Sequence, residues 1–318
     1  MRKPMPSRII PSLLLLLALL AVGCGDGTPR EYAKLYRVTE PNRYLVSYLY
    51  DPFVSFSPDS KTMVFYGVTR GVNKADVYTW NIGDAKTRKL FFGFTPNYIS
   101  GDEIIYVHPY TGRKCIQTYN FKTGEVKEVC PKLKESDYWK EIFGIESRGD
   151  GTFTTRMCDF SKYYFAGSDI CDIEGNILGP VKRIYNDTSV AVYDISGDRA
   201  VTIRSTDNDN VLNLVVSGKD GETDKKVIGH GKFGDAAWRP GGGSTLAVAD
   251  GASVLLWDAD SGEKKVIADI PKGDRSFVCR LKWSPDGKYL AIGVFVDEKE
   301  ADYMDIYVAE INQSAERG

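Results

Sequence analysis

Apolar and polar positions alternate in short runs along most of the chain, and turn-forming residues separate the runs. Residues 62–66 (Thr-Met-Val-Phe-Tyr), 253–257 (Ser-Val-Leu-Leu-Trp) and 289–295 are typical of these runs, which are rich in β-branched and aromatic side chains. Such runs favour strands that are buried on at least one face. The pattern therefore predicts an all-β chain built from many short strands.

One turn phrase recurs between pairs of these runs. Ser284-Pro285-Asp286-Gly287-Lys288 is its clearest copy, Ser57-Pro58-Asp59-Ser60-Lys61 repeats it, and Arg239-Pro240-Gly241-Gly242 resembles it. Pro sets φ for a turn, Asp bonds nearby backbone, and Gly adopts positive φ, so the phrase predicts a hairpin. Weaker copies begin at Ser100, Ser161 and Ser196.

The spacing of the copies indicates the size of the repeating unit. The intervals between successive turns are 43, 61, 35, 43 and 45 residues. Four of the five fit a unit of about 40–45 residues, which is the length of a four-stranded propeller blade.

Two further strands follow each hairpin in this pattern. The third strand is expected at 76–80, 253–257 and 305–309, and the fourth opens with cations at 88–91, 126–129, 181–184, 225–228 and 264–267. Lysine on the outer edge strand of a blade discourages pairing with other chains. The plainer interpretation is that these are ordinary surface lysines.

The two ends of the chain are expected to share one sheet. The last copy has three strands and ends near Ile311, whereas Lys34–Val38 near the N-terminus follows the fourth-strand pattern. We therefore predict a six-bladed β-propeller closed by an N-terminal strand. A seventh blade would have to lie in the 61-residue interval, which contains no turn phrase. The alternative architecture is an open sandwich of two sheets.

The turn phrases resemble the TolB-type propeller repeat, a relative of the WD-repeat, over residues 31–318. Gly229-His230 followed by Trp257-Asp258 is similar to the glycine-histidine and tryptophan-aspartate pair of a WD-repeat. TolB has an additional α/β domain before its propeller, and prolyl oligopeptidase-type peptidases carry a hydrolase domain beside theirs. We expect neither domain here, and therefore neither the role of TolB nor a peptidase activity.

The N-terminal segment has the features of an export signal. Residues 1–23 begin with the cations Arg2, Lys3 and Arg8 and continue with a short apolar stretch, as in a secretory signal peptide. Its end, 20–24 (Leu-Ala-Val-Gly-Cys), resembles a bacterial lipobox, which implies that Cys24 is lipidated. A plain signal peptide or a helical anchor are the alternatives. Residues 24–30 would then form a flexible tether.

This resemblance implies an extracytoplasmic protein of the bacterial cell envelope, held to the membrane by its N-terminal lipid. Gly25 rather than Asp follows Cys24, so the usual inner-membrane retention signal is absent, which favours the outer membrane or periplasm in a Gram-negative cell. Without residues 1–23 the chain carries 38 basic and 43 acidic residues, with no long basic run. Binding to nucleic acid, which requires clustered cations, is not expected.

Five cysteines remain after Cys24, and an extracytoplasmic location permits disulfides. Cys115 and Cys130 lie at matching distances from the turn at Lys122-Thr123, so we predict a disulfide between them. The pairing of Cys158 with Cys171 stays open, and Cys279 reads as a small buried apolar residue. No cysteine spacing indicates a zinc site, and we expect no metal or other cofactor.

Catalytic motifs are absent from the sequence. There are two histidines, His108 and His230, and both are interpreted as structural or surface groups. No nucleophile elbow, phosphate loop or dinucleotide fingerprint is present. Residues 207–210 (Asp-Asn-Asp-Asn) resemble a calcium ligand set but lack the rest of an EF-hand loop, which favours a solvated hairpin. Carboxylates from several blades could still converge to form a glycosidase-like or lyase-like site.

The long polar loops at one end of the predicted ring are the favoured binding surface. They comprise residues 69–75, 109–114, 205–211 and 297–302, together with the insertion 134–151, which carries Tyr138, Trp139 and Phe143. Clustered aromatic side chains in a charged segment are typical of an interface anchor, although they could instead pack onto the neighbouring blade. We expect a non-catalytic module that binds a protein or a cell-envelope polymer. The alternatives are a propeller enzyme acting at the channel mouth and a sensor or assembly subunit.

Overall fold

The chain folds into antiparallel β-sheets, and no helix occurs among the described residues. The computed structural model describes residues 28–29, 33–39, 44–45, 53–69, 75–108, 116–131, 141–147, 152–159, 164–172, 174, 176–180, 190–206, 211–219, 223–270, 276–298 and 301–312. Within them the strands form six sheets. No helix that could span a membrane is found in the part of the chain that is described.

The first three sheets use residues 44–180. The first sheet contains β3 (Tyr44–Leu45), β4 (Val54–Phe56), β5 (Thr62–Thr69), β6 (Ala75–Asn81) and β7 (Arg88–Phe92). The second contains β8 (Phe94–Tyr98), β9 (Glu103–Val107), β10 (Ile116–Asn120) and β11 (Val126–Val129). The third contains β12 (Glu141–Ser147), β13 (Thr152–Asp159), β14 (Tyr164–Asp172) and β15 (Ile177–Pro180).

The other three sheets use the C-terminal part of the chain and two N-terminal strands. The fourth contains β16 (Val190–Ser196), β17 (Arg199–Ser205), β18 (Leu212–Gly218) and β19 (Lys226–Gly231). The fifth contains β20 (Phe233–Trp238), β21 (Thr245–Asp250), β22 (Ser253–Asp258), β23 (Lys264–Asp269) and β1 (Thr28–Pro29). The sixth contains β24 (Phe277–Trp283), β25 (Tyr289–Glu298), β26 (Ala301–Ile311) and β2 (Ala33–Arg37).

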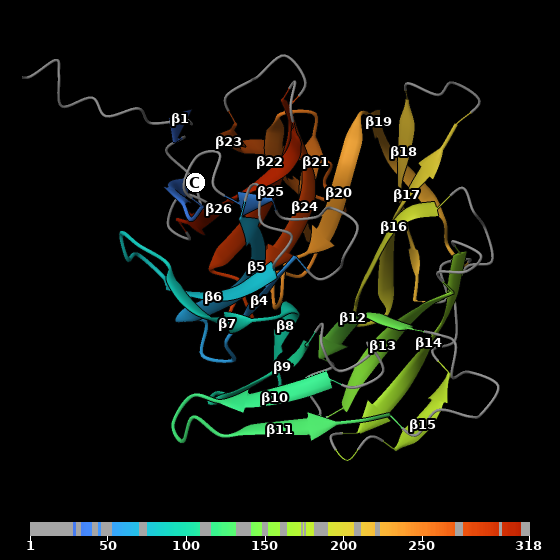
Figure 1. The fold of residues 1–318 in the computed structure, drawn as a ribbon. Coiled ribbons are helices and arrows are strands. Elements are labelled where there is room, and N and C mark those ends of the chain that lie inside the picture. The colour runs from blue at the N-terminus through green and yellow to red at the C-terminus, as the bar shows by residue number, and fades with distance from the viewer. Residues whose placement is uncertain are drawn as a thin grey trace, which may run out of the picture.

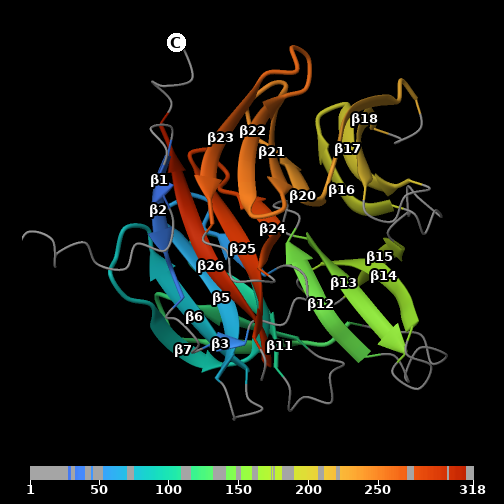
Figure 2. The same ribbon diagram turned by 90° about the horizontal axis from the view of Figure 1, so that it is seen from above.

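Successive sheets follow one another around the molecule in chain order (Figure 1). In each sheet, strands that are consecutive in the sequence lie next to one another, as in a series of hairpins. None of the sheets closes on itself. In the view from above, β12, β20 and β24 lie toward the middle, and β7 and β23 lie toward the outside (Figure 2). The arrangement is that of a β-propeller.

The predicted turn at Ser161 is wrong. Ser161 falls between β13 and β14, the second and third strands of the third sheet, whereas the first hairpin of this sheet joins β12 to β13 across residues 148–151. The segment 134–151, expected to be an insertion between blades, therefore supplies the first strand of that sheet. The fourth strand is likewise β15 and not residues 181–184. The irregular spacing of 61 and 35 residues came from choosing the wrong turn.

The apolar cores lie between neighbouring sheets. Among the described residues, five clusters of buried hydrophobic side chains each join the facing surfaces of two sheets: sixth with first, first with second, second with third, fourth with fifth, and fifth with sixth. In one of them Met63 and Phe65 of β5 meet Met304 and Ile306 of β26. Within the described residues, the first, second, fifth and sixth sheets thus bury both faces, one against each neighbour, which explains their apolar strands.

Polar side chains near the first strand of a sheet also tie it to the next sheet. Ser55 Oγ accepts a hydrogen bond from the Tyr98 backbone at 3.1 Å, and Asn97 Nδ2 donates to the Ile145 carbonyl at 2.7 Å. Two further hydrogen bonds link sheets in the same way. The Asp194 carboxylate accepts from Trp238 N, and the Asp235 carboxylate accepts from Leu281 N. The four pairs are separated by 43, 48, 44 and 46 residues, which is the length of the repeat.

The N-terminal strand β2 pairs antiparallel with β26, with Leu35 opposite Ala309 (Figure 2). Asp305 on β26 is 4% exposed and fixes the segment that follows β2. Its carboxylate accepts hydrogen bonds from Arg37 Nη2 at 2.6 Å and Thr39 Oγ1 at 2.9 Å. The strand β2 is therefore bound to the last strand, β26, by backbone pairing and by a largely buried charge pair.

Candidate functional site: a polar hollow between repeat turns

Three turns that carry the repeat phrase, called repeat turns here, comprise residues 57–62, 239–245 and 284–289. In the first, Ser57 Oγ donates to Asp59 Oδ1 at 2.7 Å and accepts from the Thr62 backbone at 3.0 Å. Asp59 Oδ1 also accepts from the Lys61 backbone at 3.2 Å. The turn thus satisfies its own backbone with side-chain oxygens, as Ser and Asp do in turns.

The third repeat turn reproduces the same scheme. Ser284 Oγ donates to Asp286 Oδ1 at 2.6 Å, Tyr289 N donates to Ser284 Oγ, and Lys288 N donates to Asp286 Oδ1. Gly287 occupies the left-handed region with φ 67°, and Ser60 adopts φ 58° at the equivalent place. The sequence phrase therefore encodes one local structure in two different sheets.

The repeat turns also contact one another across sheets. Asp286 N donates to Ser60 Oγ at 3.2 Å, and Arg239 Nε donates to the Gly287 carbonyl at 2.8 Å. The Arg239 side chain is buried and lies over the Trp283 ring, 5.2 Å from its centroid. The turns of the fifth, sixth and first sheets therefore form one connected surface at this end of the fold.

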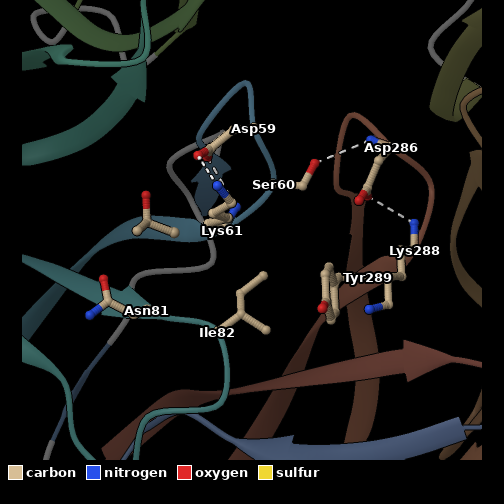
Figure 3. A pocket seen from close by; sticks show the side chains of 9 residues that line it. Asp59, Ser60, Lys61, Asn81, Ile82, Asp286, Lys288 and Tyr289 are labelled. Carbon is tan, nitrogen blue, oxygen red and sulfur yellow. Dashed lines mark hydrogen bonds and ion pairs between the residues drawn. The ribbon is translucent and has the colours of Figure 1, made fainter.

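A polar hollow lies between the first and third repeat turns (Figure 3). This first hollow has a volume of about 630 Å³. It is lined by Asp59, Ser60, Lys61, Thr62, Asn81, Ile82, Asp286, Lys288 and Tyr289. Figure 3 shows the Ser60 hydroxyl directed at the Asp286 backbone and the Asp286 carboxylate directed at Lys288, with Ile82 and Tyr289 lying below them. Its side chains offer both charges, an amide and one aromatic ring.

The carboxylates of the first hollow are held in their ionised form. The hydrogen bond from Ser57 lowers the pKa of Asp59. Burial alone would raise the pKa of Asp286, but hydrogen bonds from Ser284 and the Lys288 backbone bring it below its ordinary value. The pKa of Lys288 is raised by its contacts with Tyr289 and Glu310, and its Nζ lies 3.0 Å from Glu310 Oε1. These groups are suited to fixed electrostatic recognition of a polar ligand.

None of the site residues predicted from the sequence lines the first hollow, and most of them lie outside the described residues. Cys24, Cys115, Tyr138 and Trp139 fall outside the described residues, as do residues 207–210. Phe143 lies in β12, where the pairing with β13 is irregular between Ile142 and Gly144. The long polar loops that were expected to bind a partner also fall mainly outside the described residues.

Of the described cysteines that can be classified, one is in a disulfide and two are not. Cys130 is disulfide-bonded. Since Cys115 is not described, its pairing with Cys130 stays a prediction. Cys171 is buried and is not in a disulfide, so it does not pair with Cys158. Cys279 is not in a disulfide either, and burial raises the pKa of its thiol to about 11, in keeping with a structural interpretation.

The two histidines make structural contacts. His108 contacts the Phe92 ring edge-on, with centroids 5.9 Å apart. His230 Nδ1 lies 2.6 Å from Asn213 Oδ1 on the neighbouring strand. A side chain at the preceding Gly229 would overlap the Trp257 ring, so glycine allows β19 to lie against that ring. No cluster of three or more His, Cys, Asp or Glu side chains that could hold a metal ion is found in the described part of the chain.

Sequence reasoning missed the first hollow, although it found the residues around it. Asp59 and Asp286 were recognised as turn formers, and Lys61 and Lys288 as members of the same phrase. The signal was the repeat itself, because equivalent turns of adjacent blades lie at the same end of a propeller. Asn81 and Ile82 carry no such signal and reach the hollow through the β6–β7 turn.

Comparisons with known proteins support the fold. The sequence matches no protein-family model and no curated protein. Among solved structures, the apo AtxE2 isopeptidase is 11% identical with a TM-score of 0.52, over 88% of this chain and 52% of that chain. An oligogalacturonate lyase in complex with manganese is 12% identical with a TM-score of 0.50, over 91% of this chain and 96% of that one.

TolB from Acinetobacter baumannii is also similar, at 22% identity over 54% of this chain and 41% of that chain, with a TM-score of 0.33. The chain spans about half the length of the isopeptidase it matches. At these identities the likeness establishes a β-propeller fold and no activity.

Proposed function

We propose that this chain is a lipid-anchored, extracytoplasmic binding module that recognises a protein or a cell-envelope polymer and does not itself catalyse a reaction. In this proposal the six sheets are six blades, and β2 completes the last of them, which closes the ring. The lipid would be attached at Cys24, and residues 138–143 would add an aromatic contact from the opposite end of the ring.

The observation that carries the proposal is that the two carboxylates of the first hollow are hydrogen-bonded within their own turns. Asp59 and Asp286 each accept hydrogen bonds from their own turn, and the pKa of each is lowered. A general acid requires the opposite change, a pKa raised toward neutrality. Rigid turns with ionised side chains around an open volume are better suited to binding, because the groups are preorganised and lose little entropy when a ligand is bound.

A propeller enzyme acting on a sugar polymer is the competing function. The fold likeness to an oligogalacturonate lyase motivates it, since that protein has the same architecture over most of its length. The two sequences are only 12% identical, so the likeness is evidence for a shared fold and not for a shared activity.

One experiment separates the two functions. The lipidated protein is isolated from its native envelope after mild cross-linking, and bound proteins and polymers are identified by mass spectrometry and sugar analysis. We expect a specific partner that is lost when Trp139→Ala is introduced without change in the melting temperature. Recovery of no partner, together with depolymerisation of oligogalacturonate or another glycan by the pure protein with or without Mn²⁺, would refute the proposal.

A further inference from the structure

A second hollow opens directly beside the first, between the first and second sheets. It has a volume of about 420 Å³ and is lined by Thr62, Thr79, Asn81, Asp84, Lys86, Arg88, Tyr98, Gly101 and Phe121. Thr62 and Asn81 line both hollows. The two hollows therefore adjoin, and together they are called the groove, whose lining residues come from the sixth, first and second sheets.

The second hollow contains two cationic side chains that form no ion pair within the described residues. Lys86 and Arg88 are exposed, and neither has a carboxylate partner within the residues that the structure describes. Asp84, the single carboxylate of the lining, accepts a hydrogen bond from Asn81 Nδ2 at 2.8 Å. Other cations of the groove are already paired, Lys61 with Asp59 and Lys288 with Glu310.

Aromatic rings and hydroxyl groups form the rest of the lining. The rings of Tyr98 and Phe121 stack with centroids 5.9 Å apart and an interplanar angle of 26°. Tyr98 OH lies 2.7 Å from Thr62 Oγ1, and burial raises the pKa of Tyr98, so its hydroxyl stays neutral. A neutral phenol and two threonines can donate and accept hydrogen bonds, and the partly exposed Phe121 offers an apolar surface.

We propose that the second hollow is a subsite for a carboxylate-bearing sugar unit of an acidic polysaccharide. This rests on the proposed binding function and names the class of its ligand. Arg88 and Lys86 would bind the carboxylate, because a guanidinium forms paired hydrogen bonds with a planar carboxylate. The hydroxyls of Thr62, Thr79 and Tyr98 would bond sugar hydroxyls. The apolar face of the sugar ring would lie against Phe121.

The arrangement favours a sugar chain over a lipid headgroup or a peptide. The second hollow adjoins the first hollow, whose mixed charges and amide suit further polar units of a chain. A phosphate group alone would use the two cations but would leave the hydroxyls and the aromatic surface without a role. A chain of hydroxylated rings with one carboxylate per unit uses all three.

Binding to immobilised polygalacturonate fragments tests the subsite, with neutral dextran as the matched uncharged polymer. We expect the wild-type protein to bind polygalacturonate and not dextran. Arg88→Gln should weaken binding at least about tenfold, which is the size expected for loss of one charge-assisted contact. Phe121→Ala should weaken it as well, with melting curves confirming that the variant is folded.

Lys226→Gln is the control variant. Lys226 is exposed and begins β19 as Arg88 begins β7, but it lies in the fourth sheet, away from the groove. Its replacement removes one positive charge and should leave binding unchanged. Equal losses in Arg88→Gln and Lys226→Gln would mean that only net charge matters and would overturn the subsite.

Two other outcomes would also overturn it. One is failure of the wild-type protein to bind polygalacturonate. The other is Arg88-dependent binding to phosphatidylglycerol vesicles in place of polygalacturonate, which would assign the cations to lipid phosphate. If the protein captures an envelope partner that Arg88→Gln still retains, the binding function stands and the acidic-sugar subsite fails. Turnover of a glycan without stable capture would instead refute the function.

Discussion

Individual turn residues decide how the strands of this protein are joined. In the β22–β23 turn, Asp258 Oδ1 accepts from the backbones of Asp260 and Ser261, and Oδ2 accepts from Ser244 Oγ. These bonds, led by that of Ser244, lower the pKa of Asp258 to about 2. The group therefore stabilises the fold in its charged form. Asp59 and Asp286 do the same in the repeat turns, which is why aspartate recurs at these places.

Replacement of Asp258 should reveal this stabilisation and its dependence on pH. We expect Asp258→Ala to lower the free energy of unfolding by about 1 kcal/mol at pH 7. Because the folded pKa is depressed, the contribution is complete above the unfolded pKa of 3.8 and is lost as pH falls through about 2. The difference between the two proteins in urea unfolding should therefore shrink from pH 5 to pH 2. A constant difference would contradict the assigned role.

At the scale of elements, short apolar runs located most strands of the sixth sheet and several strands of the first and fifth sheets. The third sheet was placed wrongly because the polar residues around Ser161 are locally indistinguishable from a repeat turn. Its true first hairpin spans residues 148–151 between β12 and β13, and no proline marks it. Local composition shows that a turn is present, but pairing across the sheet decides which turn it is.

The register of β10 and β11 gives a prediction at this scale. Ile116 lies opposite Val129, so continuation of the pairing by one residue would place Cys115 opposite the disulfide-bonded Cys130. We expect peptide mapping without reductant to find these two linked. The double change Cys115→Ser and Cys130→Ser should cost about 3 kcal/mol of stability, since the bond closes a short loop. Detection of a free Cys130, or its linkage to another cysteine, would contradict the pairing.

At the scale of the whole molecule, stability comes from contacts between sheets that are distant in sequence. Asp235, 8% exposed, uses one oxygen for Ala236 N within its own strand and the other for Leu281 N in the next sheet. Asp305 binds Arg37 and Thr39 across 268 and 266 residues. Such bonds form only after the sheets have assembled, so they fix the order and the spacing of the sheets.

Loss of the Asp305 carboxylate should therefore destabilise the whole fold. We expect Asp305→Ala to lower the free energy of unfolding by about 2 kcal/mol or more, because Arg37 loses its charge partner in a largely buried site. Chemical unfolding should remain a single transition if the ends of the chain support one cooperative structure. The double variant with Arg37→Ala should recover part of the loss. An unchanged midpoint in Asp305→Ala would show that backbone pairing of β2 is sufficient.

The repeat phrase by itself determined that this chain is all-β and built from hairpins of a propeller type, because turn chemistry and strand alternation are local properties. It also placed most of the charged and hydroxyl groups that line the first hollow. Only the tertiary structure decided which turns meet, that Ser60 contacts Asp286 and that Thr62 and Asn81 connect the two hollows. Those contacts depend on how neighbouring sheets pack, and no periodicity along one strand encodes the position of a side chain in another sheet.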